Sequence, residues 1–231
     1  VKAMIPTCPS GDFYRDTAFD NGTPSVTASF LVPDAAKGDD TAYYREYWKT
    51  RDRVARAPAI ARADIPLLLW SGWHEPGALG SLELYTVLQN VAAGRPASAP
   101  IRAGQSVSAK YQVIVGDWGH GGGLDLGIQL QFYDAWIKGI DTGLSKNTDT
   151  PLHLAELGGT RRWINARCYP LVERYKPLFL AGGQKLSQAL DSQSGQDELN
   201  WMRQDVPSKA VEYTSEPFAD GAMLAGPLAA R

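Results

Sequence analysis

Two short apolar runs constrain the fold of this chain more than any other feature. Residues 67–71 and 111–115 are continuous apolar stretches of strand length, each bounded by turn-forming residues. Strands that are apolar on both sides fit a parallel sheet that is covered by helices on both faces. A loop and then a helical pattern follow each run, at residues 81–91 and 127–139. This repeat of strand, loop and helix predicts an α/β layer architecture with right-handed crossovers.

Composition narrows the range of functions. The 231 residues carry a formal net charge of −2, and 44% of them are hydrophobic, as is ordinary for globular proteins. Nucleic acids and anionic membranes attract clustered Lys and Arg, which this balance does not provide. The longest apolar run, residues 65–70, is too short to span a bilayer. Cys8 and Cys168 lack metal-type spacing and are expected to be buried as small hydrophobic groups. We therefore expect a small-molecule or peptide-like substrate, and neither a cofactor nor a metal.

The sequence changes character beyond Pro151. Short alternating runs separated by Gly and Ser replace the helical patterns, which predicts an all-β second unit. We expect residues 1–148 to form the α/β part and residues 149–231 to form the first part of a β-sandwich. Within the α/β part, residues 17–41 predict an irregular connection and residues 42–57 a helix.

Two polar loops follow the two apolar runs and carry the candidate chemistry. Glu75 comes after the first run and His120 after the second. Parallel α/β sheets place their sites at the carboxyl ends of the strands. An acid followed by a histidine is the order of the last two members of the Ser-acid-His triad in α/β-hydrolases. The acid accepts a hydrogen bond from one imidazole nitrogen and fixes the tautomer, while the other nitrogen takes the proton of the nucleophile.

The segments around these residues resemble the α/β-hydrolase family of cocaine esterases and Xaa-Pro dipeptidyl-peptidases. Residues 68–75, Leu-Leu-Trp-Ser-Gly-Trp-His-Glu, are similar to the family's "vPvLlvgGWyD". Residues 113–120, Val-Ile-Val-Gly-Asp-Trp-Gly-His, are similar to its "lviGPWgHg". Further segments resemble family motifs in the same order, so that the resemblance spans nearly the whole chain: residues 1–6, 12–16, 132–141, 152–163, 213–219 and 226–227.

The resemblance implies a serine hydrolase that cleaves ester or amide bonds through an acyl-enzyme. His120 takes the place of the general base, and Glu75 stands where the family has Asp. Asp117 stands where the family has Pro, so Asp117 remains open as an alternative acid. The resemblance also implies that residues 152–163 begin a C-terminal jelly roll.

The side chains beside the pair are candidates for a pocket. Trp73 and Trp118 are candidate walls of an apolar pocket. His74 stands where the family has an aromatic residue and is expected at the rim. A metal site made of His74, Glu75 and His120 is a further alternative, although the sequence lacks the HExxH helix that places two His ligands on one face.

The nucleophile of the family does not occur in this sequence. The resemblance places its elbow, G-x-S-Y-x-G, upstream of Val1. Ser106 follows the first glycine of such a motif, but the second glycine is missing and the segment precedes a strand, whereas an elbow lies between a strand and a helix. The oxyanion-hole donors would also lie outside the chain, and the helical cap would be shortened to residues 17–57. We therefore expect a fragment that is inactive alone, and its localisation stays open.

A partial fold also leaves other roles open. The alternative to a hydrolase is a non-catalytic binding or scaffold module in which the sandwich recognises a ligand. Sequence upstream of Val1 discriminates the two, because an elbow serine there would indicate an enzyme. Unpaired strands at the N-terminal edge would leave backbone and apolar surface uncovered, so we expect aggregation, a homo-oligomer or a complementing chain that carries the nucleophile.

Overall fold

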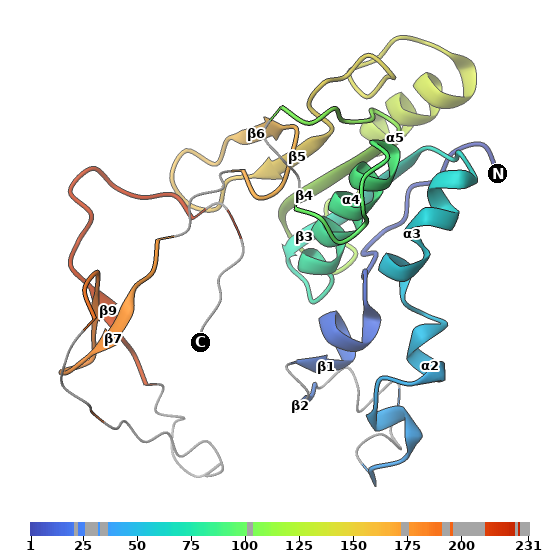
Figure 1. The fold of residues 1–231 in the computed structure, drawn as a ribbon. Helices are drawn as coiled ribbons and strands as arrows, with labels where there is room; N and C mark the ends of the chain where they lie inside the picture. Colours follow the sequence, from blue (N-terminus) through green and yellow to red (C-terminus); the bar gives the residue numbers. More distant parts are fainter. Residues whose placement is uncertain are drawn as a thin grey trace. The chain divides into compact units, whose positions relative to one another are not determined.

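The computed structural model shows a mixed α/β chain that separates into two compact units, Val1–Leu171 and Val172–Arg231 (Figure 1). The structure describes residues 1–20, 23–25, 32, 37–100, 104–171, 176–190, 195, 211–224 and 226.

A four-stranded sheet forms the centre of the first unit, with the order β3-β4-β5-β6. Strands β3 (Leu67–His74), β4 (Tyr111–Gly119) and β5 (Leu152–Ala155) run parallel to their neighbours. Strand β6 (Trp163–Ala166) pairs antiparallel with β5. The two apolar runs of the sequence are thus the adjacent parallel strands β3 and β4, and the predicted parallel α/β sheet is confirmed.

The start of the chain lies along the other side of β3. Met4 and Thr7 form parallel bridges to β3, and the backbone of this segment exchanges hydrogen bonds with it. The first is Met4 N to Pro66 O at 3.0 Å, and the last is Cys8 N to Trp70 O at 2.7 Å. Residues 4–8 therefore extend the parallel sheet by one further chain segment.

Helices cover both faces of this sheet, as Figure 1 shows for α4 in front of β3 and β4. On one face, side chains of α3 (Arg53–Arg62) and α4 (Ala78–Ala92) pack in one core with the odd-numbered apolar residues of β3 and β4. On the other face, Phe132 of α5 (Leu126–Tyr133) packs with even-numbered residues such as Leu68 and Ile114. Burial on both faces explains why β3 and β4 are continuous apolar runs.

Local interactions define both ends of the helical segment formed by α5 and η4. The side chain of Asp125 accepts from Ile128 N at 3.0 Å and caps α5. The helix continues into η4 (Asp134–Lys138) and ends at Gly139, whose φ of 75° suits the left-handed conformation that glycine adopts at helix ends. The helical pattern predicted over residues 127–139 is therefore confirmed.

Short elements fill the region between the first segment and α3. They pack around Trp48, which lies in a small aromatic cluster with Phe13, Tyr14 and Phe19. The helix predicted over residues 42–57 is interrupted, because α2 ends at Lys49 and Asp52 then caps α3 by accepting from Ala55 N at 2.9 Å. The elements of this region are η1 (Tyr14–Ala18), β1 (Phe19–Asp20), β2 (Thr23–Pro24), η3 (Asp40–Ala42) and α2 (Glu46–Lys49).

The division between the units differs from the expected one. Leu152–Ala155, expected to begin the second unit, is instead a strand of the first sheet, and the division lies at Leu171–Val172. In the second unit, β7 (Phe179–Ala181) pairs antiparallel with β8 (Lys185–Ser187), and β8 pairs parallel with β9 (Thr214–Ser215). The described part of this unit is thus a three-stranded sheet, and the jelly roll stays a prediction.

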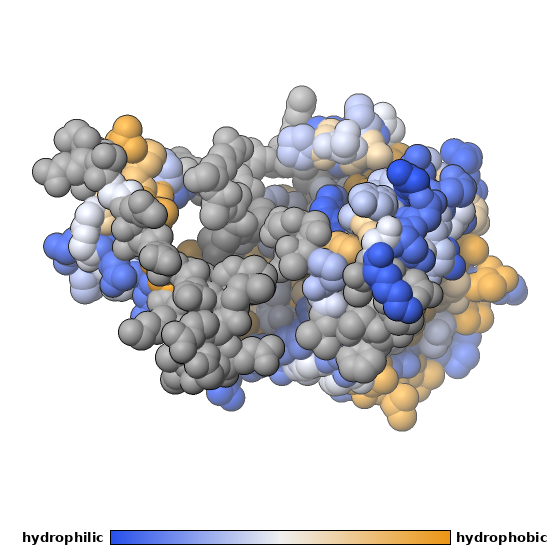
Figure 2. Space-filling model, turned by 90° about the horizontal axis from the view of Figure 1, so that it is seen from below, coloured by the Kyte–Doolittle hydropathy of each residue, from blue (hydrophilic) through white to orange (hydrophobic). Residues whose placement is uncertain are grey.

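The surface mixes polar and apolar side chains. In the view of Figure 2, apolar groups reach the surface among hydrophilic ones. Leu126, Leu130 and Ile137 of α5 and η4 are exposed. Within the described ranges, the helices all lack the length or the apolar character that crossing a membrane requires.

Candidate functional site

Glu75 and His120 meet at the carboxyl edge of the sheet. Glu75 follows β3 and His120 follows β4, so the parallel pairing of these strands brings their loops together. His120 Nδ1 lies 3.1 Å from Glu75 Oε2. An ionised carboxylate only accepts hydrogen bonds, so Nδ1 carries the proton in this contact and Nε2 is left as an acceptor. The structure therefore brings together the two residues that the sequence singled out, whereas their catalytic roles stay predictions.

The two members of the pair differ sharply in exposure. The Glu75 side chain is fully buried, whereas 76% of the His120 side chain is exposed. The other carboxylate oxygen of Glu75 accepts from the Ser71 hydroxyl and from Gly72 N, the latter at 3.2 Å. A buried carboxylate needs such donors because it has lost its contact with water. The Glu75 carboxylate is thus fixed within the protein, and the His120 imidazole faces solvent.

Asp117, the alternative acid, contacts the other histidine of this edge. His74 Nε2 lies 2.8 Å from Asp117 Oδ1, and both side chains are exposed. The register between β3 and β4 shifts between Gly72 and His74. Such a bulge re-aims side chains near the end of a strand. Glu75 and Asp117 therefore each contact a different histidine.

Cys8 is a third member of this site that the sequence did not single out. It follows the segment paired with β3, and its Sγ accepts from Gly121 N at 3.1 Å. Burial, together with a hydrogen bond to Glu75, raises the pKa of the Cys8 thiol to about 11. The thiol is therefore protonated at neutral pH, which makes it a poor nucleophile. The sequence predicted both cysteines as buried small hydrophobic groups, whereas both are only partly buried.

One sequence signal could have found Cys8. It follows an apolar, strand-like run at the start of the chain, just as Glu75 and His120 follow theirs. Adjacent parallel strands end at a common edge, so three such positions are candidates for one site. Ser71 had no such signal, because a serine inside a buried strand shows its partner only once the loop is folded.

The two tryptophans lie on opposite faces of the sheet. Trp73 packs on the core under α4, and its Nε1 donates to Ala155 O at 2.7 Å. Trp118 packs on the other core and stacks on Trp70, with ring centroids 5.6 Å apart. They therefore do not line one common pocket, because the sheet lies between them.

Glycines make room for the Trp118 ring. A Cβ atom placed on Gly116 or on Gly123 would overlap the indole, and one placed on Gly72 would overlap the Trp118 backbone. Gly123 also has a φ of 67°, a conformation that other residues rarely adopt. Beside it, Gly122 O accepts from Trp70 Nε1 at 3.2 Å. The ring and these glycines together fix the loop that carries His120.

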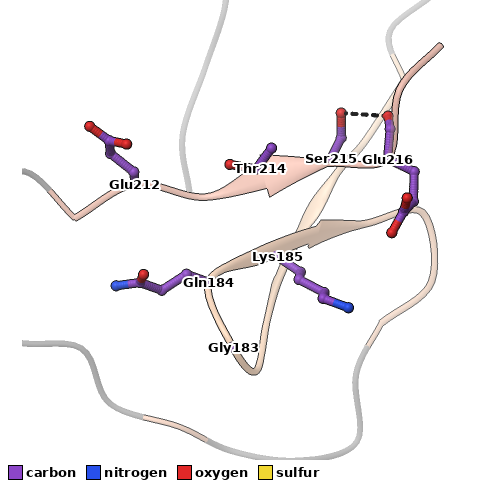
Figure 3. A pocket seen from close by; sticks show the side chains of 7 residues that line it. All are labelled: Gly183, Gln184, Lys185, Glu212, Thr214, Ser215 and Glu216. Carbon is purple, nitrogen blue, oxygen red and sulfur yellow. Dashed lines mark hydrogen bonds between the residues drawn. The ribbon is translucent and has the colours of Figure 1, made fainter.

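A hollow of about 450 Å³ lies in the second unit. Figure 3 shows Lys185 on one strand, Thr214 and Ser215 on the neighbouring strand, and Glu212 before it. Ser215 Oγ donates to Glu216 O at 3.0 Å. The lining of this hollow is polar, so the hollow suits a polar group of a ligand better than an apolar one.

Comparison with protein-family models and with curated protein sequences gives no match. Among solved structures, the chain is similar to the crystal structure of an aminopeptidase from the marine sediment archaeon Thaumarchaeota archaeon. The TM-score is 0.60 and the sequence identity 16%, over 90% of this chain and 43% of the aminopeptidase chain. This chain thus spans less than half of that protein. At this identity the likeness shows the fold alone, a mixed α/β fold with parallel strands.

Proposed function

We propose that Glu75 and His120 are the acid and the base of a serine-type hydrolase that cleaves ester or amide bonds through an acyl-enzyme. The observation that carries this proposal is the 3.1 Å contact between a fully buried carboxylate and a solvent-facing imidazole at the carboxyl edge of a parallel sheet. The resemblance of segments 68–75 and 113–120 to the cocaine-esterase and Xaa-Pro dipeptidyl-peptidase family supports it, as does the fold shared with an aminopeptidase.

The geometry suits one sequence of proton transfers. Glu75 holds Nδ1–H, so Nε2 of His120 accepts the proton of an attacking hydroxyl. The hydroxyl oxygen forms a bond to the substrate carbonyl carbon. The carbon–oxygen or carbon–nitrogen bond to the leaving group then breaks as the imidazolium gives its proton to the leaving alcohol or amine, which leaves the acyl group on the nucleophile. A water molecule then attacks the acyl-enzyme by the same proton transfers and releases the carboxylic acid product. The negative charge of Glu75 stabilises the imidazolium at both stages.

The nucleophile in this proposal is a serine outside the 231 residues. Ser71 touches the acid, but it is fully buried and donates to Glu75 rather than facing His120. The thiol of Cys8 stays protonated at neutral pH. In this proposal a further polypeptide segment supplies the hydroxyl and the oxyanion-hole donors.

Labelling with a fluorophosphonate probe tests the proposal in two steps. The isolated chain should neither react with the probe nor hydrolyse a p-nitrophenyl acyl ester. A polypeptide that also carries the sequence encoded upstream of Val1 should do both. Stoichiometric labelling of a serine in the isolated chain would contradict the proposal, as would an upstream sequence without an elbow serine.

Two matched variants of the active polypeptide identify the acid. Glu75→Gln should lower kcat by roughly 10³–10⁴-fold, because the imidazolium loses its counter-charge and its tautomer is no longer fixed. Asp117→Asn should change kcat by less than about tenfold, since its partner is His74. The reverse ranking would make Asp117 the acid and contradict the assignment of Glu75.

A non-catalytic binding role is the second candidate, and the polar hollow beside β8 and β9 is the observation that favours it. In that case the ligand would contact Lys185 or Glu212. Lys185→Ala would then weaken ligand binding, with no effect on hydrolysis by any longer form of the protein.

A further inference from the structure

Three different metal-ligating groups converge where the strands end. Cys8 Sγ, a carboxylate oxygen of Glu75 and a ring nitrogen of His120 all lie within 4.8 Å of one another. Each comes from a separate part of the chain. Cys8 ends the segment 4–8, Glu75 follows β3, and His120 follows β4. Among the residues that the structure describes, this cluster lacks His74, which contacts Asp117 instead, so the alternative ligand set of His74, Glu75 and His120 is not brought together.

The donor set matches one class of cation. Thiolate, imidazole and carboxylate are the ligands of Zn²⁺, and three protein ligands leave a fourth position open. Bond lengths of about 2.0–2.3 Å place tetrahedral ligand atoms about 3.3–3.6 Å apart. Because the ligand atoms lie within 4.8 Å of one another, binding needs a contraction of at most about 1.5 Å. The exposed His120 side chain has the freedom to supply it.

Outer contacts already orient two of the three ligands. Ser71 and Gly72 hold one carboxylate oxygen of Glu75 and leave the other free for the site. Gly121 N–H points at Cys8 Sγ from 3.1 Å and would stabilise a thiolate there. Hydrogen bonds of this kind orient metal ligands and tune their affinity for the ion.

We propose that Cys8, Glu75 and His120 bind a thiophilic divalent cation such as Zn²⁺. The thiol proton leaves to solvent as the sulfur–metal bond forms. The ion takes the carboxylate oxygen and the ring nitrogen, Nδ1, that otherwise bond to each other, and the proton of Nδ1 passes through solvent to Nε2 of the same ring. Metal binding therefore removes the Glu75–His120 pair from proton transfer and inhibits any reaction that depends on the pair.

Cobalt binding to the isolated 231-residue chain tests this proposal without a substrate. Wild type should bind one equivalent of Co²⁺ with a near-ultraviolet thiolate-to-cobalt charge-transfer band, and Zn²⁺ should displace it. Cys8→Ser should lose the band, whereas Cys168→Ser, which removes the other cysteine, should keep it. His120→Ala should keep the band but weaken binding at least tenfold, since one ligand is lost.

Several results of these cobalt titrations would contradict the proposed metal site. A band that survives Cys8→Ser, a band that disappears with Cys168→Ser, or the absence of a band in wild type would each overturn the proposal. His120→Ala guards against a folding artefact at Cys8, because its ring is mostly exposed. Unchanged affinity in that variant would also count against the site. None of these results depends on whether the pair serves a hydrolase.

Discussion

At the scale of single residues, Glu75 shows how a longer acid can occupy this position. Its carboxylate reaches back to Ser71 and Gly72 on the strand it has just left, while its second oxygen meets His120. The sequence predicted the pairing of loops, because the order acid then histidine follows two buried strands. It left open whether Glu75 or Asp117 contacts His120, because that contact depends on the register shift between β3 and β4.

Removing the Ser71 hydroxyl should lower the free energy of unfolding. Ser71→Ala takes away a hydrogen bond to a buried charge, so we expect a loss of about 1.5–3 kcal/mol. Ser81→Ala is the matched control. Its equally buried hydroxyl donates to the neutral carbonyls of Pro9 and Gly77, so its loss should be about 0.5–1.5 kcal/mol. Urea unfolding of both variants measures the difference. Equal losses would mean that Ser71 does not support the carboxylate.

At the scale of elements, local patterns predict the strands and helices that carry the site, whereas they do not predict which sheet residues 152–155 join. The apolar runs at residues 67–71 and 111–115 are strands, and the helical pattern at residues 81–91 lies within α4, because each depends only on local periodicity. The pairing of β5 with β4 joins residues far apart in the sequence. An alternating pattern predicts that a strand forms, but it does not predict which sheet the strand joins.

The hairpin of β5 and β6 should respond to acid through His153. Its Nδ1 contacts Asn165 Oδ1 at 2.7 Å across the hairpin, and its Nε2 is buried without a partner among the described residues. Burial lowers the pKa of His153 below its ordinary value. The unfolded state therefore binds the proton first, and stability falls as the pH drops from about 6.5 toward the folded pKa.

The matched measurement is urea unfolding of wild type and His153→Gln at pH 7.5 and at pH 5.5. The variant should lose less stability between the two values, because it removes this titration while every other group titrates in both proteins. An equal or steeper loss in His153→Gln would show that His153 does not contribute to the acid sensitivity.

At the scale of the whole molecule, the division at Leu171 gives the first unit all of its sheet. The boundary expected from the sequence followed the change from helical to alternating patterns near Pro151. Such patterns indicate secondary structure and do not indicate which elements pack together. Leu152 and Leu154 belong to the core shared with α4, which no local pattern could show. The sequence thus predicted the class of architecture and the edge that carries the pair, whereas Cys8 required knowledge of the strand order.

Two truncations distinguish the boundaries. Residues 1–171 should fold cooperatively, with a melting temperature within about 4 °C of the full chain, the shift expected for about 1 kcal/mol. Residues 1–148 should aggregate or lose cooperativity, because the loss of β5 and β6 opens the edge of β4 and uncovers apolar surface. Circular dichroism melts and size-exclusion chromatography check both. A stable, monomeric 1–148 form would place β5 and β6 outside the first unit.

The packing of Trp118 has a consequence for how this protein can vary. Gly72, Gly116 and Gly123 are small because one indole and its backbone occupy the space that their side chains would need. A mutation at any of these positions alone meets a steric barrier, whereas loss of the indole removes much of that barrier for Gly116 and Gly123. Related sequences that lack this tryptophan should therefore be the ones that carry larger residues at those two positions, so the positions should co-vary.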